Sequence, residues 1–170
     1  KKLEVTRQII AWAKPKNQEL FSIENFPCWT YADPSAGGIF YGFPSLPEAI
    51  FGGVTGLKFA HHFKGQFTDP NKVNRKVSQE EEQWLIDSIR EFLPNAIESI
   101  LKMHTCLYTS TPDDNFIIDF HPEDEDVVVA AGFSGHGFKF ASVVGEILYD
   151  LITTRMTIHP IDFFNAKRLK

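Results

Sequence analysis

The feature that most constrains this chain is an unbroken apolar run, Val127 to Ala131, followed by a glycine-rich loop and a helical stretch. A continuous apolar run is typical of a strand buried on both faces, because neither face then has to meet water. The loop spans residues 132–137 and the helical stretch spans residues 138–151. The sequence thus predicts a closing strand–loop–helix unit. Such a strand needs neighbours on both sides, and this chain offers few, so we expect part of a larger protein to be absent.

Strands dominate the first two-thirds of the chain. Segments rich in β-branched and aromatic residues predict strands at residues 3–12, 21–23, 28–31, 39–43, 57–63, 103–109 and 116–120. One helix begins at a capping box, Ser78 to Glu81, and ends before Pro94. Its apolar stripe comprises Trp84, Leu85, Ile89 and Phe92. The acidic residues Asp124 to Asp126 predict a turn. Together these elements predict an α+β fold.

Charge and composition exclude several classes of protein. The chain has 17 Lys and Arg against 22 Asp and Glu, a net charge of −5, whereas a general nucleic-acid binder carries a basic face. No run of about 18 apolar residues occurs, so no transmembrane helix is predicted. Residues 1–7 are charged, lack an initiator Met and lack the apolar stretch of a signal peptide. The two cysteines, Cys28 and Cys106, are expected to be free thiols, and we predict a cytoplasmic location.

Simple catalytic and metal-binding motifs do not account for the chain. The six histidines show no zinc spacing with Cys or carboxylates, so no metal site is predicted. The glycines in residues 132–137 follow the order Gly-x-x-Gly-x-Gly, which differs from the dinucleotide fingerprint and from the esterase motif. On local chemistry, a plain tight turn and a loop that presents backbone N–H groups to an anion are equal alternatives.

Two positions raise a chemical question. Lys58 and His62 are four residues apart, so their side chains share a face in a strand and also in a helix. A lysine in this apolar stretch indicates a role or a partner, and the plain alternative is an exposed strand face. Cys106 shares a strand face with Tyr108. A lone Cys is most often a small buried apolar residue, whereas a reactive one needs a nearby positive charge, for which His104 is the nearest candidate in sequence.

Six short motifs are weak signals individually but form a specific pattern as a set. They are Tyr41-Gly42-Phe43-Pro44, Gly56-Leu57-Lys58 with His62, Cys106-Leu107-Tyr108-Thr109, Thr111-Pro112-Asp113, Phe116-Ile117-Ile118-Asp119 and the ten-residue glycine loop from Ala131 to Phe140. In this order they closely resemble the C-terminal half of the family of monomeric sarcosine oxidase and N-methyltryptophan oxidase. The resemblance covers nearly the whole chain.

The resemblance implies a fold in two parts. Residues 1–112 would form the second part of a substrate domain with a mixed sheet, and residues 113–170 would form the closing segment of an FAD-binding domain. The family's N-terminal dinucleotide-binding half is absent from this sequence, so the family fold is expected to be incomplete. We therefore expect the chain to be inactive alone, without bound FAD, and to expose apolar surface that favours self-association.

The resemblance also implies roles for individual residues. Cys106 would bond covalently to the flavin of FAD through a thioether, and Lys58 would promote the reaction of reduced flavin with oxygen through its positive charge. His62 would lie close to the substrate. Lys139 would pair with the substrate carboxylate and lie beside the cofactor. Further residues would line the flavin loop (Gly135, His136, Gly137) and the substrate pocket (Tyr41, Tyr108).

The implied reaction is oxidation of an N-methyl amino acid, or a similar small secondary amine, to its imine, with O2 reduced to hydrogen peroxide. Residues 47–50 lengthen a loop next to the implied pocket, and residues 33–38 are altered as well, so sarcosine, N-methyltryptophan and cyclic imino acids are all left open. Two other functions also stay open. One is a non-catalytic ligand-binding domain, and the other is a flavin amine dehydrogenase that passes electrons to a carrier. The implied partners are the amine, O2 and the absent N-terminal half, without nucleic acid or membrane.

Overall fold

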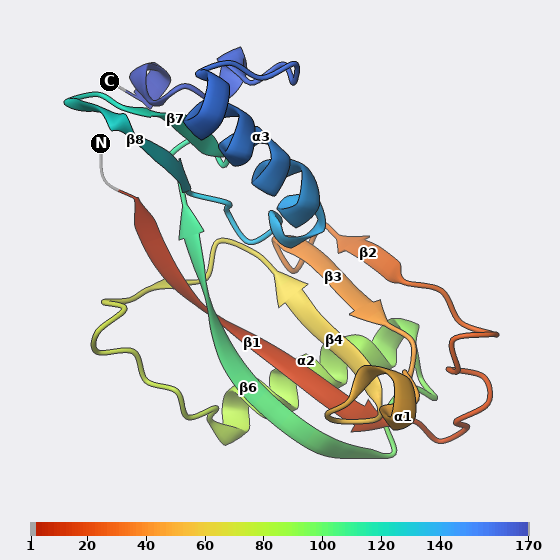
Figure 1. Cartoon of the computed structure of the whole chain (residues 1–170). Coiled ribbons are helices and arrows are strands. Elements are labelled where there is room, and N and C mark those ends of the chain that lie inside the picture. The colour runs from red at the N-terminus through yellow and green to blue at the C-terminus, as the bar shows by residue number, and fades with distance from the viewer. Residues whose placement is uncertain (1–2, 170) are drawn as a thin grey trace. The chain divides into compact units, whose positions relative to one another are not determined.

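The computed structural model describes residues 3–169 and divides them into two compact units. The N-terminal unit contains residues 7–66 and 71–106. The C-terminal unit contains residues 107–169 with two short segments, 3–6 and 67–70. Strands and helices occur in both units (Figure 1), so the predicted α+β class is confirmed.

A six-stranded sheet provides the framework of the N-terminal unit. Its strands follow the order β2-β3-β4-β1-β5, and β6 also pairs with β1 (Figure 1). The strands are β1 (Glu4–Lys14), β2 (Trp29–Asp33), β3 (Gly38–Phe43), β4 (Leu57–His62), β5 (Gln66–Phe67) and β6 (Ser99–Ser110). The pairings β1–β4, β2–β3 and β3–β4 are antiparallel. Alternating β-branched and aromatic residues favour these strands, because they fill a pleated surface well.

Two segments of the N-terminal unit differ from the sequence prediction. The predicted strand at residues 21–23 is not formed, and a single bridge joins Ser22 to Ser45 instead. Turn hydrogen bonds explain the difference, because the carbonyl oxygen of Ser22 accepts from the N–H groups of Asn25 and Phe26. The lengthened loop at residues 47–50 contains the one-turn helix α1 (Glu48–Phe51).

Helix α2 (Gln79–Phe92) covers one face of the sheet. The predicted capping box is confirmed: Oγ of Ser78 accepts the N–H of Glu81, and the Glu81 carboxylate accepts the N–H of Ser78. Leu85 and Ile89 are buried in the core against the sheet, where removal of apolar surface from water stabilises the fold. Trp84 of the predicted stripe also faces the sheet, with its ring centre 5.9 Å from that of Phe40, but it is 47% exposed.

The C-terminal unit contains the predicted strand–loop–helix unit. Strands β7 (Ile117–His121) and β8 (Asp124–Ala131) form an antiparallel hairpin. After the glycine loop, a 3-10 turn leads into α3 (Ala141–Thr154). Three short 3-10 helices are present at Phe138–Phe140, Asp162–Phe164 and Ala166–Leu169. The core of this unit is formed by the buried side chains of Phe116, Ile118, Ile147 and Leu151.

Two predictions about β8 are wrong in this structure. Its apolar run is not buried on both faces, because the sheet has two strands and Val127 is 44% exposed. The acidic residues Asp124 to Asp126 do not form the turn but begin the strand, since Asp124 pairs with His121. The turn lies at residues 122–123, where Pro122 has the fixed φ that suits a turn.

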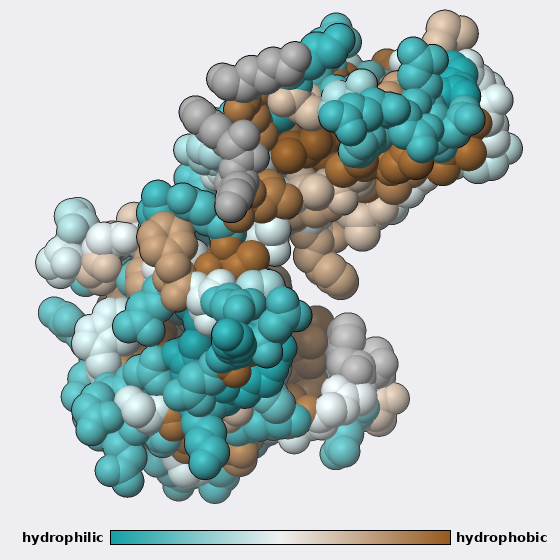
Figure 2. Space-filling model, turned by 90° about the vertical axis from the view of Figure 1, so that its left-hand side faces the viewer, coloured by the Kyte–Doolittle hydropathy of each residue, from teal (hydrophilic) through white to brown (hydrophobic). Residues whose placement is uncertain are grey.

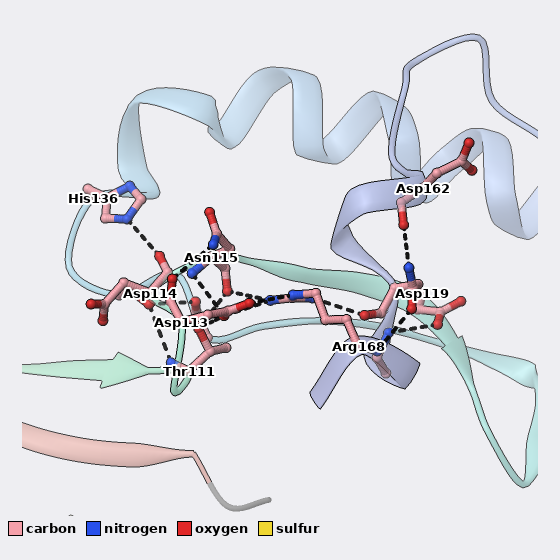
Figure 3. A network of polar contacts seen from close by, with 12 residues as sticks. Thr111, Asp113, Asp114, Asn115, Asp119, His136, Asp162 and Arg168 are labelled. Atoms are coloured by element: carbon pink, nitrogen blue, oxygen red, sulfur yellow. Dashed lines mark hydrogen bonds and ion pairs between the residues drawn. The ribbon is translucent and has the colours of Figure 1, made fainter. Parts of the chain in front are cut away.

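A polar network joins the C-terminal residues to the segment before β7 (Figure 3). The guanidinium of Arg168 donates two hydrogen bonds to the Asp113 carboxylate, at 2.8 and 3.2 Å. It donates a third to the carbonyl oxygen of Asn115 at 2.8 Å. The Asp119 carboxylate accepts the N–H of Ala166 at 2.9 Å. Charge-assisted, bidentate contacts of this kind fix both geometry and register.

Several large hydrophobic side chains of the C-terminal unit are exposed, among them those of Tyr149, Ile152, Met156, Ile158 and Phe163. Hydrophobic patches interrupt the hydrophilic surface in Figure 2. Exposed apolar surface on this scale is typical of a contact region. Within residues 3–169, none of the helices has both the length and the apolar character that crossing a membrane requires.

Candidate functional site

The sheet of the N-terminal unit presents a face that α2 does not cover. In β4, Leu57, Phe59 and His61 point towards the α2 side. Side chains alternate along a strand, so Lys58 and His62 point to the other face. The prediction that these two residues share a face is confirmed. We call this second surface the open face.

Lys58 is held between two aromatic rings on the open face. It pairs across strands with Trp12 of β1 and with Phe43 of β3. Its Nζ lies 5.4 Å from the centre of the Trp12 ring and 5.2 Å from that of Phe43. Contacts of a cation with aromatic faces stabilise the charge in a partly dry setting. Lys58 is half-buried, so the simple alternative of a fully solvated lysine does not describe it.

Cys106 of β6 lies close enough to Lys58 for the ammonium charge to act on the thiol. Burial raises the pKa of the Cys106 thiol, and the Lys58 charge opposes part of that rise. His104, the nearest candidate in sequence, instead packs its ring edge-to-face against Trp12, with 6.0 Å between ring centres. The cation whose charge acts on the thiol is therefore Lys58, which lies far from Cys106 in sequence but in the same sheet.

The open face also carries Tyr41 of β3. Tyr41 pairs across strands with Ala60, and its ring contacts Phe43 edge-to-face with 6.2 Å between centres. The structure therefore brings together four of the predicted site residues on this face: Tyr41, Lys58, His62 and Cys106. Sequence reasoning missed Trp12 and Phe43 as their neighbours, and it named His104 only as a possible source of positive charge beside Cys106. His104 shares the open face as the ring partner of Trp12. Alternation along each strand places all three on the open face once the strand pairing is known.

The glycine loop lies in the C-terminal unit and is a tight turn. Backbone φ is positive at Gly132, Ser134 and Gly135, with values of 64°, 50° and 77°. The N–H of Ser134 donates to the carbonyl oxygen of Thr109 at 3.0 Å, which ties the loop to the end of β6. Gly135 packs against the buried Tyr108, because a Cβ there would lie 2.4 Å from the Tyr108 ring. Only glycine fits this contact.

The loop also has features of a site that binds anions. Among residues 3–169, no acceptor takes the backbone N–H groups of Gly135 and Gly137. The ring of His136 contacts the carbonyl oxygen of Asp114 through Nε2 at 3.1 Å. Lys139 donates from Nζ to the carbonyl oxygen of His136 at 2.6 Å. Free N–H groups and an adjacent ammonium group favour negative charge. The geometry of the loop therefore agrees with both alternatives, a plain tight turn and a loop that presents N–H groups to an anion.

The predicted site residues thus fall into two sets. One set lies on the open face of the N-terminal unit, and the other lies in the C-terminal unit and comprises Tyr108, Gly135, His136, Gly137 and Lys139. Cys28 and Cys106 are free thiols, as expected. Within residues 3–169, no three His, Cys, Asp or Glu side chains are grouped so as to hold a metal ion.

The sequence matches the family described as FAD dependent oxidoreductase over residues 3–151. The chain belongs to the FAD dependent oxidoreductase family. The aromatic, half-buried open face of the N-terminal unit fits a flat cofactor. On this face Cys106 has the thiol that could hold such a cofactor covalently.

Curated relatives of this chain include a monomeric sarcosine oxidase and an N-methyl-L-tryptophan oxidase. Monomeric sarcosine oxidase of Bacillus sp. (strain B-0618) is 42% identical over 168 residues, which cover 98% of this chain and 41% of the relative. N-methyl-L-tryptophan oxidase of Yersinia pestis (strain Pestoides F) is 33% identical over 143 residues, covering 83% of this chain and 36% of the relative. The chain spans about two fifths of the length of these curated relatives.

Solved structures share the fold of this FAD dependent oxidoreductase chain. NikD, an unusual amino acid oxidase of nikkomycin biosynthesis, superposes with a TM-score of 0.73 at 21% identity, over 96% of this chain and 42% of its own. L-proline dehydrogenase from P. horikoshii gives a TM-score of 0.73 at 24% identity, over 96% of this chain and 39% of its own. At these identities the likeness supports the fold alone.

Proposed function

We propose that this chain is the C-terminal part of an FAD-dependent oxidase. The enzyme would convert an N-methyl amino acid, or a similar small secondary amine, to its imine and reduce O2 to hydrogen peroxide. The observation that carries the proposal is that the Cys106 thiol and the Lys58 ammonium share the open face, where the Lys58 charge acts on the thiol. Two relatives named for sarcosine and N-methyl-L-tryptophan support the substrate class.

The residues of the open face have distinct roles in this proposal. Cys106 holds the flavin through a thioether, and the nearby Lys58 charge favours the thiolate, which is the form of the thiol that reacts. When bound, FAD supplies the chemistry that accepts two electrons from the amine and passes them to O2. Lys58 places positive charge where negative charge develops on oxygen, and the rings of Trp12 and Phe43 keep water from part of its surface.

Other residues bind and orient the substrate. His62 lies on the same face as Lys58 and is proposed to contact the amine. Tyr41 and Tyr108 are proposed to line the pocket with aromatic surface. Lys139 is proposed to pair with the substrate carboxylate. Its Nζ would then leave the carbonyl oxygen of His136, to which it donates in this structure. The N–H groups of the glycine loop would support negative charge on the reduced flavin.

Domain assignment and location are part of the same proposal. Residues 1–112 would belong to the substrate domain and residues 113–170 to the FAD-binding domain, with the N-terminal half of the enzyme as their partner. The free thiols of Cys28 and Cys106 support a cytoplasmic location, because exported proteins tend to pair their cysteines.

Covalent attachment tests the proposal directly. Because the chain spans about two fifths of its relatives' length, the test uses the polypeptide of the complete reading frame. After acid precipitation, the yellow colour is expected to stay with the wild-type protein. Cys106→Ser is expected to release all flavin into the supernatant, and the matched control Cys28→Ser is expected to retain it. Release from the wild type, or retention by Cys106→Ser, would rule out the covalent assignment.

Oxygen consumption separates the proposed oxidase from a dehydrogenase and from a non-catalytic protein. With sarcosine, N-methyltryptophan or a cyclic imino acid as substrate, one mole of hydrogen peroxide is expected for each mole of amine. Turnover that occurs only with an artificial electron acceptor would indicate a dehydrogenase. A protein that folds without flavin and turns over no amine would indicate a ligand-binding domain.

A further inference from the structure

A cavity lies on the α2 side of the sheet, which is the opposite side from Lys58 and Cys106. Its volume is about 370 Å³, within the range of sites that hold small molecules. Residues of β1, β4 and the first two turns of α2 line it, all in the N-terminal unit. The residues that matter here are Ile9, His61, Phe63, Glu80, Trp84 and Leu85.

Aromatic rings form one wall of this cavity. The ring of His61 stacks on Phe63, with 4.7 Å between ring centres and 14° between planes. Trp84 lies 5.2 Å from His61, centre to centre. Phe63 is 40% exposed and Trp84 is 47% exposed, so both rings are accessible to an occupant. Large aromatic side chains are seldom exposed together without a partner.

The polar groups of the cavity leave one negative charge unbalanced. The guanidinium of Arg7 contacts the Glu81 carboxylate at 2.5 Å and donates to the carbonyl oxygens of Asn74 and Lys76, so its donors are in use. Arg7 and Glu81 therefore cancel one another. Within residues 3–169, Glu80 has no ion-pair partner, and hydrogen bonding with Ser78 lowers the pKa of its carboxyl, which keeps it charged at neutral pH. The net charge of the lining is accordingly negative.

His61 adds a second, independent feature. The side chain is 4% exposed, and neither ring nitrogen has a hydrogen-bond partner among the described residues. Burial lowers the pKa of His61, so the ring is neutral at neutral pH and contributes no charge that would repel a cation. A neutral ring stacked in an aromatic wall extends the flat apolar surface of the cavity.

We propose that this cavity is a binding site for an organic ammonium ion that has an aromatic or other flat apolar group. The apolar group would lie against Phe63 and Trp84, and the ammonium would lie beside Glu80. Negative faces of aromatic rings and an unpaired carboxylate are the chemistry that recognises such ions. The site is separate from the open face and does not depend on the flavin.

Calorimetric titration of the flavin-loaded protein of the complete reading frame tests the site. The probe is benzyltrimethylammonium, whose charge does not vary with pH, with benzyl alcohol as the neutral control and phenylacetate as the anionic control. The cation is expected to bind about tenfold more tightly than either control. Trp84→Leu is expected to weaken binding by about tenfold. Both Trp84 and Glu80 are exposed, so these variants are expected to fold.

A matched pair of charge variants isolates the role of Glu80. Glu80→Gln is expected to weaken cation binding roughly fivefold. Glu82→Gln makes the same change in the same turn but outside this cavity, and it is expected to leave binding unchanged. The indole N–H signal that Trp84→Leu removes from the NMR spectrum is expected to shift on titration. Cys106→Ser is expected to bind the probe as the wild type does, which separates this site from the flavin proposal.

Several results would overturn the inference. Benzyl alcohol binding as tightly as the cation would indicate a plain apolar pocket. Tighter binding of phenylacetate would indicate an anion site at Arg7. Equal effects of Glu80→Gln and Glu82→Gln would remove the charge argument. Absence of any binding up to about 10 mM would leave no site of useful affinity.

Discussion

Nζ of Lys58 lies 5.4 Å from the centre of the Trp12 ring, and the two residues are cross-strand partners in β4 and β1. This contact holds a positive charge on the open face, and no ion pair within residues 3–169 neutralises it. Phe43 flanks the ammonium from β3 at 5.2 Å. The charge therefore remains available to act on the neighbouring Cys106 thiol and on an occupant of this face.

Lys58→Met tests whether this charge serves the reaction with oxygen. The substitution keeps most of the length of the side chain but removes the charge. Flavin reoxidation is expected to slow by at least about tenfold, while reduction by the amine changes little. Stopped-flow absorbance measures both steps. The control is Lys72→Met, because the Lys72 side chain is exposed to solvent, and this variant is expected to alter neither step. Equal slowing of both steps would remove the proposed role in oxygen activation.

Gly135→Ala tests the packing of the glycine loop. Backbone φ is +77° there, and a Cβ would lie 2.4 Å from the Tyr108 ring. The free energy of unfolding is expected to fall by about 2–4 kcal/mol. Gly145→Ala in α3 has open space around its Cβ, and it is expected to raise stability by about 0.5–1 kcal/mol. Urea denaturation measures both, and a harmless Gly135→Ala would contradict the contact.

Arg168→Met tests the C-terminal network and its pH dependence. The hydrogen bonds from Arg168 hold the pKa of the Asp113 carboxyl well below its ordinary value of 3.8. A carboxyl with a depressed folded pKa stabilises the fold above the unfolded pKa, and this stabilisation is lost as pH falls through the folded pKa. The variant is therefore expected to be less stable at pH 7 and to show a smaller loss of stability below pH 3.8.

The control for this experiment is the more exposed ion pair between Arg155 and Asp126. Its side chains are 52% and 86% exposed, compared with 14% and 37% for Arg168 and Asp113. Solvent screens exposed pairs, so Arg155→Met is expected to have the smaller effect. Thermal melting at a series of pH values compares the two variants. Identical acid profiles for Arg168→Met and the wild type would show that Asp113 is not stabilised by this contact.

Ser78→Ala tests the start of α2. Loss of the Oγ acceptor leaves the N–H of Glu81 without its cap, and stability is expected to fall by about 0.5–2 kcal/mol. Ser88→Ala in the same helix loses only a hydrogen bond to the carbonyl oxygen of Trp84 and is expected to change stability by less than about 0.5 kcal/mol. Circular dichroism during denaturation measures both, and equal effects would argue against the capping box.

Features that depend on neighbouring residues were predictable from the sequence. The capping box at Ser78, the alternation that places Lys58 and His62 on one face, and the strand–loop–helix unit near the C-terminal end all follow from local spacing. The errors also have local causes. The predicted turn at Asp124 to Asp126 lies one pair of residues earlier, because Pro122 is the better turn residue and Asp124 pairs with His121.

The sequence by itself determined the family resemblance, the α+β class and the identity of the candidate site residues. Only the tertiary structure decided that Trp12 and Phe43 flank Lys58, that the charge acting on Cys106 is that of Lys58, and that burial raises the pKa of the Cys106 thiol. The physical reason is that strand register and burial are set by contacts between distant segments. Local spacing therefore indicates the face to which a side chain points, whereas its neighbours across the sheet depend on the complete fold.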